Sequence, residues 1–154
     1  MRDHIIYKIN TANEKQVYAH LLACSLNFVP PLQERINVEA YAKKIASLAV
    51  NFEAWQNGIL AGLIAAYFNE DKAKPAFITN VSVLKEMMGE GIASKLLQMT
   101  EQYAIAENVT AITLEVNANN QPAISFYNKY GYTLQAEKQD CLVMIKNIPG
   151  SQGA

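Results

Sequence analysis

The segment from residue 76 to about residue 103 constrains the fold most, because it runs from a strand pattern through two glycines into a helix pattern. Residues 76–83 are β-prone, Gly89 and Gly91 mark a turn, and apolar side chains from Ile92 onward recur at helical spacing. The first N–H groups of such a helix have no partner within it, and the helix dipole adds partial positive charge there. Glycine also lets a phosphate approach the main chain closely, so the turn predicts a pyrophosphate site.

Two glycines alone are a weak motif, and a tight turn that binds nothing fits them equally well. A Walker P-loop is excluded, because Gly91 is followed by Ile92-Ala93-Ser94 instead of Lys and Ser or Thr. A dinucleotide fingerprint would need a third glycine at Ser94 and an early position in a series of βαβ units. What remains is a mixed domain with one phosphate-binding βαβ unit.

The elements around this unit predict an α/β (α+β) fold. Asn57-Gly58 between two apolar runs is a strong type I′ hairpin signal. Thr11 and Glu14 match a capping box at the start of the first helix. We expect a mixed, mostly antiparallel sheet of about six or seven strands flanked by about four helices. The expected strands are 5–9, 51–56, 59–68, 76–83, 111–116, 132–136 and 141–146, and the helices begin near residues 13, 38, 92 and 120.

Composition limits the domain count and the partners. The chain has 154 residues, a formal net charge of -1 and a pI near 6.1. We expect one domain over residues 1–147 and a flexible tail over 148–154. Without a clustered basic face or a long apolar segment we expect no nucleic-acid partner and no membrane partner. Because the chain has only two histidines, no metal site is predicted, and the charged N-terminus predicts a cytoplasmic protein.

Two stretches carry a family resemblance. Val81-Ser82-Val83-Leu84 through Gly89-Glu90-Gly91-Ile92-Ala93-Ser94-Lys95-Leu96-Leu97 resembles the acetyl-CoA motif of the GNAT acyltransferase superfamily. Leu114-Glu115-Val116 and the run from Asn120 to Tyr132 resemble its second hallmark, in the expected order and at the expected distance. The resemblance implies the GNAT-like acyl-CoA N-acyltransferase fold and acetyl-CoA as cosubstrate.

The same resemblance implies which residues bind the cofactor. The N–H groups of Met88, Gly89, Glu90, Gly91, Ile92, Ala93 and Ser94 would hold the pyrophosphate. Val81 and Val83 would pair with the pantetheine arm as if it were another strand. Asn120 would bond to the same arm, although it also suits a helix N-cap. Lys129 or Lys95 would meet the 3′-phosphate. Met88 departs from the family pattern, which has Gln or Arg at this place.

Two further residues are candidates for proton chemistry. By resemblance, Tyr127 donates a proton to the leaving thiolate of CoA, whereas the alternative is a half-buried helix tyrosine. Glu115 is the candidate general base, and a solvated strand carboxylate is the alternative. The acceptor would bind near the stretch from Phe28 to Arg35 and near Tyr41. In that region Arg35 could hold a carboxylate or phosphate.

The sequence therefore predicts an acetyl-CoA-dependent N-acetyltransferase. It would move an acetyl group directly to a primary amine of a small molecule, such as an amino sugar, or of a peptide. We expect a monomer or homodimer. The alternatives are a noncatalytic acyl-CoA-binding sensor or partner module and, more remotely, a nucleotide-binding domain that uses the same turn.

Overall fold

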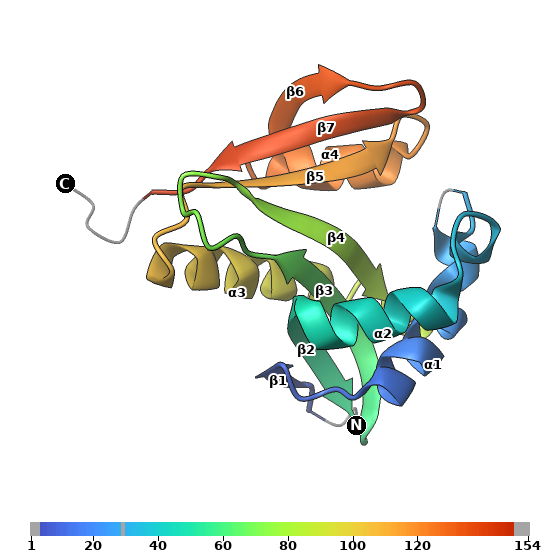
Figure 1. Cartoon of the computed structure of the whole chain (residues 1–154). Coiled ribbons are helices and arrows are strands. Elements are labelled where there is room, and N and C mark those ends of the chain that lie inside the picture. Colours follow the sequence, from blue (N-terminus) through green and yellow to red (C-terminus); the bar gives the residue numbers. More distant parts are fainter. Residues whose placement is uncertain (1–3, 29, 150–154) are drawn as a thin grey trace.

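The computed structural model describes residues 4–28 and 30–149 and shows one seven-stranded sheet in the order β1-β2-β3-β4-β5-β7-β6 (Figure 1). Within these residues all neighbouring strands are antiparallel except β4 and β5. The strands are β1 (Ile6–Ile9), β2 (Val50–Gln56), β3 (Ile59–Tyr67), β4 (Ala76–Val83), β5 (Ala111–Asn117), β6 (Thr133–Glu137) and β7 (Cys141–Asn147). The α-helices are α1 (Glu14–Cys24), α2 (Val38–Leu48), α3 (Ile92–Ala106) and α4 (Gln121–Lys129), and the short 3-10 helices are η1 (Ser25–Asn27), η2 (Leu32–Glu34) and η3 (Lys85–Met87). The predicted fold class is confirmed.

Helices cover both faces of the sheet. Leu63 and Ala65 of β3 pack with α1 and α2, whereas Ile64 and Ala66 pack into the core that contains α3. Alternate residues of a strand point to opposite faces, so β3 is buried on both sides and is apolar along its length. At Gly62 an added Cβ would lie 2.6 Å from Cγ2 of Ile92, the first residue of α3. Gly62 therefore lets the start of α3 rest directly on β3.

A bulge in β4 opens the sheet into a fork. Asn80 pairs with Ala65 and Ile78 pairs with Ala66, so the ladder to β3 passes over Thr79. The parallel ladder between β4 and β5 joins Ala76–Ile78 to Ile112–Leu114 and stops immediately before this bulge. Because a bulge bends its strand and increases the local twist, β4 turns away from β5 beyond Ile78, as Figure 1 shows.

The predicted hairpin at Asn57-Gly58 is confirmed, whereas the predicted cap of the first helix is wrong. Asn57 and Gly58 have φ of 52° and 76° and join β2 to β3, as a type I′ turn requires. The predicted capping box at Thr11 and Glu14 is wrong. Asn13 caps α1 instead, in a reciprocal pair with Gln16. Thr11 is displaced from that role because its N–H and hydroxyl both donate to the buried carboxylate of Glu53.

The predicted flexible tail begins too early. Ile148 is buried, and its N–H donates to the carbonyl of Thr110 at 2.7 Å, which continues the β5–β7 pairing beyond Asn147. The remainder of the predicted tail, residues 150–154, lies outside the described residues, as do residues 1–3 and 29. Among the helices that are described, none has the length and apolar character needed to cross a membrane.

Candidate active site

A cavity of about 410 Å³ lies against the glycine turn between β4 and α3, and we call it the turn cavity. Its walls come from β4, the turn, the first turn of α3 and the end of α4. Of the predicted cofactor-binding residues, it brings together Val81, Val83, Met88, Gly89, Gly91, Ile92, Ala93, Ser94 and Lys129. Glu90 and Asn120 do not line it. The first of the resembling stretches and the end of the second, at Phe126, Lys129 and Tyr130, thus line one cavity.

Where the turn cavity borders the glycine turn, the available hydrogen-bond donors are main-chain N–H groups. Gly89 and Gly91 have φ of 86° and 79°, a left-handed conformation that favours glycine. Gly91 is the N-cap of α3 and has no side chain with which to cap the helix, and the Ser94 hydroxyl donates to the Gly91 carbonyl. The N–H groups of the first helical turn therefore face the cavity end without intrahelical partners, which is the arrangement that binds a phosphate.

The edge of β4 supplies a second set of main-chain groups. The Leu84 N–H donates to the Ala61 carbonyl of β3 at 2.8 Å. In an antiparallel ladder these groups alternate, so the N–H and C=O of Val83 and Val81 are turned away from β3. This edge of β4 is not paired with β5 either, because the parallel ladder between the two strands ends at Ile78. The open edge is therefore available to an extended ligand at the two positions where the sequence predicted strand-like pairing.

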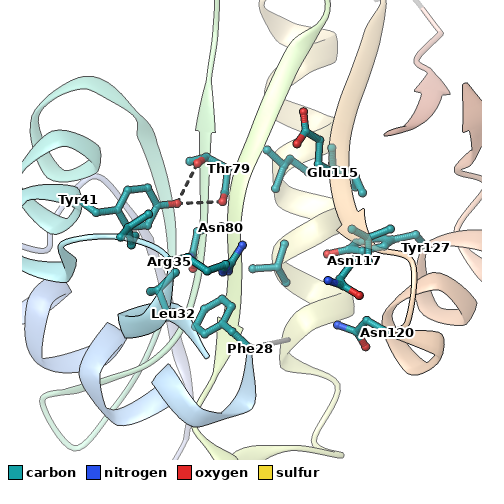
Figure 2. Close-up of a pocket in the computed structure, with 15 residues that line it drawn as sticks. Phe28, Leu32, Arg35, Tyr41, Thr79, Asn80, Glu115, Asn117, Asn120 and Tyr127 are labelled. Atoms are coloured by element: carbon teal, nitrogen blue, oxygen red, sulfur yellow. Dashed lines mark hydrogen bonds between the residues drawn. The ribbon is translucent and has the colours of Figure 1, made fainter. Parts of the chain in front are cut away.

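The fork between β4 and β5 holds a second cavity of about 250 Å³, which we call the fork cavity. Figure 2 shows Tyr41, Thr79, Arg35 and Phe28 on one side of it and Glu115, Asn117, Asn120 and Tyr127 on the other. Val81 lines both the turn cavity and the fork cavity. The two cavities therefore adjoin the same part of β4, two residues beyond the bulge at Thr79.

Tyr127, the predicted proton donor, lines the fork cavity. The residue is 8% exposed and packs edge-on against Phe126 and Tyr132. Burial raises the pKa of the phenol well above its usual range. Tyr127 is therefore protonated at neutral pH and can donate a hydrogen bond into the cavity.

Glu115 and Asn120 also line the fork cavity. The Glu115 carboxylate accepts a hydrogen bond from Nζ of Lys138 at 2.8 Å, and this contact raises the pKa of the lysine. Asn120 is the N-cap of α4, and its Oδ1 accepts from the Ala123 N–H at 3.3 Å. The N-cap interpretation of Asn120 is confirmed, and its side chain faces the fork cavity and not the turn cavity.

The sequence did not reveal the contact that supports the bulge. The Tyr41 hydroxyl donates to the Thr79 carbonyl at 2.9 Å and lies 2.8 Å from the Thr79 hydroxyl (Figure 2). Burial is the main cause of the raised pKa of Tyr41. The bulge removes the Thr79 carbonyl from the regular ladder, and a side chain from α2 supplies the missing donor. The sequence placed Tyr41 near the acceptor, but nothing local identified Thr79 as its partner.

The comparisons with known proteins agree with this geometry. The sequence profile of the acetyltransferase (GNAT) family matches residues 15–132. The chain belongs to this family. Membership confirms the GNAT resemblance, the predicted fold and acetyl-CoA as the cosubstrate of the family.

Individual GNAT relatives match over parts of their length. Streptothricin acetyltransferase of Escherichia coli is 34% identical over 59 residues, which are 38% of this chain and 34% of the relative. L-2,4-diaminobutyric acid acetyltransferase of Halalkalibacterium halodurans is 28% identical over 90 residues, 57% of this chain and 48% of the relative. The chain thus spans a third to a half of these curated relatives.

Solved GNAT structures match nearly the whole chain. PaiA N-acetyltransferase from Thermoplasma acidophilum, solved in complex with coenzyme A, superimposes with a TM-score of 0.71 at 15% identity. The match covers 92% of this chain and 99% of that one. At this identity the likeness establishes the fold.

A network of buried hydrogen bonds joins β4 to α1 on the face of the sheet that α1 covers. Nδ1 of His20 on α1 donates to the Leu60 carbonyl at 2.9 Å, and Nε2 lies 2.9 Å from the Ser82 hydroxyl. Ser82 in turn donates to Oδ1 of Asn80 at 2.8 Å. Burial lowers the pKa of His20 to about 4. The imidazole is therefore neutral and structural, and it ties α1 to the strand that both cavities share.

The depressed pKa of His20 predicts a pH-dependent stability. Between pH 7 and pH 5 the unfolded chain gains a proton at this histidine and the folded chain does not, so the free energy of unfolding should fall by about 2 kcal/mol. Denaturant unfolding at the two pH values measures the difference. His20→Gln should remove most of this fall, whereas His4→Gln at the exposed histidine should keep it. If the free energy of unfolding of His20→Gln fell as much between pH 7 and pH 5 as that of the unmodified chain, His20 would not be the group responsible.

Proposed function

We propose that this chain catalyses direct transfer of an acetyl group from acetyl-CoA to a primary amine of a small molecule. The observation that carries the proposal is that the turn cavity and the fork cavity meet at Val81. The turn cavity has the main-chain donors that suit a pyrophosphate, and the open edge of β4 leads from them to the fork. The acetyl thioester would lie at this junction, with the amine approaching from the fork cavity.

The reaction needs no covalent intermediate on the protein. The amine nitrogen attacks the thioester carbonyl carbon, the C–N bond forms, and the C–S bond breaks. The amine loses one proton and the departing CoA sulfur gains one. A main-chain N–H of β4 beside the bulge would stabilise the developing negative charge on the carbonyl oxygen. Cys24 is an unsuitable nucleophile, because burial raises the pKa of its thiol to about 12.

The chain's own side chains would move the two protons. Tyr127 would donate to the departing sulfur, since its buried phenol stays protonated and faces the fork cavity. Glu115 would accept the amine proton, directly or through water, from the opposite part of the same cavity. The small-molecule acceptor is supported by the limited size of the fork cavity and by two relatives named for streptothricin and L-2,4-diaminobutyric acid.

The first experiment separates binding from chemistry. Acetyl-CoA at 100 times its dissociation constant should stabilise the chain by about 2.7 kcal/mol, seen as a raised unfolding midpoint. Free CoA thiol should then appear only when a primary amine is added. Stabilisation without thiol release across an amine panel would replace the enzyme by a noncatalytic acyl-CoA-binding module. Stabilisation by ATP, with acetyl-CoA competing for the same site, would favour a nucleotide-binding domain.

Tyr127→Phe tests the general acid. The variant keeps the packed ring and loses the hydroxyl, so kcat should fall roughly a hundredfold while the dissociation constant of acetyl-CoA stays nearly unchanged. Steady-state kinetics and a thermal binding assay measure the two quantities. Tyr130→Phe removes a neighbouring phenol that lines the turn cavity and should have little effect on kcat. Equal losses of binding and turnover in Tyr127→Phe would indicate a structural role instead.

Glu115→Gln tests the general base. The change preserves the shape of the side chain and removes its titration, so the acidic limb of the kcat/KM profile against pH should disappear. The profile of each variant is measured between pH 5 and pH 9. Glu39→Gln, an exposed carboxylate on α2 outside both cavities, serves as the control and should retain the limb. If Glu115→Gln also retains it, the base lies elsewhere.

A further inference from the structure

The walls of the fork cavity carry opposite charges at separate places. Arg35 follows η2 on the α1–α2 connection, and Glu115 lies on β5 across the fork (Figure 2). Among the described residues that line this cavity, Arg35 is the one basic side chain. The amide side chains of Asn80, Asn117 and Asn120 line the same cavity. The cavity therefore has a basic side chain in one wall and an acidic side chain in another.

The guanidinium of Arg35 has no ionic partner among residues 4–28 and 30–149. Its Cζ lies 6.0 Å from the centre of the Phe28 ring, and Figure 2 shows the side chain reaching from the α1–α2 connection into the fork. The positive charge also acts on Tyr41, where it opposes the rise in pKa that burial causes. Arg35 therefore lies beside the Phe28 ring, and within the described part of the chain no carboxylate neutralises its charge.

We propose that the acceptor is a small amine that also bears a carboxylate, and that Arg35 binds this carboxylate. This inference rests on the proposed function, since it names the class of acceptor for the same site. A guanidinium presents two parallel N–H donors that match the two oxygens of a carboxylate. With the carboxylate at Arg35, the amine of the same molecule is directed toward Glu115 and the thioester junction at Val81.

Cavity size and charge distinguish this class from other amines. A cavity of about 250 Å³ has room for a molecule of amino-acid size. A polycationic amino sugar would place positive charge near Arg35 and leave that residue without a counter-ion. A simple diamine would offer no anion to the guanidinium of Arg35. An amino acid or diamino acid supplies a carboxylate for Arg35 together with the amine that reacts.

Matched pairs of acceptors isolate the contribution of the carboxylate. The pairs are 2,4-diaminobutyrate with 1,3-diaminopropane, ornithine with 1,4-diaminobutane, and lysine with 1,5-diaminopentane, and in each the second member is the first without its carboxylate. In the unmodified chain kcat/KM should be roughly ten- to a hundredfold higher for the carboxylate-bearing member of at least one pair, as expected for a charge-assisted pair of hydrogen bonds. Amino-acid amides, which keep the shape and lose the charge, should behave like the diamines.

Three variants assign that preference to Arg35. Arg35→Gln should reduce the ratio within the pair to about one, and Arg35→Lys should retain part of it, since an ammonium keeps the charge but not the fork. Lys43→Gln removes an exposed positive charge on α2 outside the cavity and should leave the ratio unchanged. Arg35 is itself exposed, so the unfolding midpoint and the stabilisation by acetyl-CoA should be the same in Arg35→Gln as in the unmodified chain.

The outcomes separate this inference from the proposed function. Turnover of amines with equal kcat/KM for both members of every pair would overturn the carboxylate assignment and leave the acetyltransferase standing. A preference that survives in Arg35→Gln would overturn the role of Arg35. Efficient turnover of an amidated peptide or an amino sugar, with none of the carboxylate-bearing amines, would show a different acceptor class. Absence of turnover with any amine would instead overturn the proposed function, and with it this inference.

Discussion

The bulge at Thr79 is the feature on which both cavities depend. It removes one residue of β4 from the ladder to β3, and the parallel ladder to β5 ends at the preceding residue, Ile78. The bulge is stable because the Tyr41 hydroxyl donates to the Thr79 carbonyl. The fork cavity and the open edge of β4 follow from this single departure from regular pairing. A flat, fully paired sheet of the same sequence would have neither.

The supports of the bulged strand come from both faces of the sheet. On one face α1 reaches β4 through His20 and Ser82, and α2 reaches it through Tyr41. On the other face α3 begins directly over Gly62 of β3. The start of α3 and the edge of β4 are therefore fixed relative to each other. This is what a ligand needs when its phosphates bind at the helix and its extended arm pairs with the strand.

Neighbouring residues along the sequence were enough to predict the helices, strands and turns. The features that the sequence did not predict depend on contacts between residues far apart in the chain. Asn57-Gly58 and the glycines before Ile92 act through their own backbone angles, so their turns could be recognised from neighbouring residues. The bulge could not, because it depends on register with β3 and on a hydroxyl 38 positions away at Tyr41. Glu53 was missed for the same reason. It is a fully buried carboxylate on β2 that accepts bonds from Trp55 and from two N–H groups at Thr11 and Ala12, and the segment around it reads as an ordinary strand.

The turn cavity presents main-chain donors and the fork cavity presents side chains, so we expect Met88 to permit cofactor binding although the family resemblance implies Gln or Arg at this place. Met88 lines the turn cavity with a half-exposed side chain, but the donors at that end are N–H groups set by glycine conformations and by the start of α3. We therefore expect cofactor binding to depend little on most side chains. The fork cavity is lined instead by charged and amide side chains from the α1–α2 connection, β5 and α4. If the proposed function holds, acceptor choice would reside in residues of this cavity such as Arg35, which is exposed and lies outside the sheet and the turn.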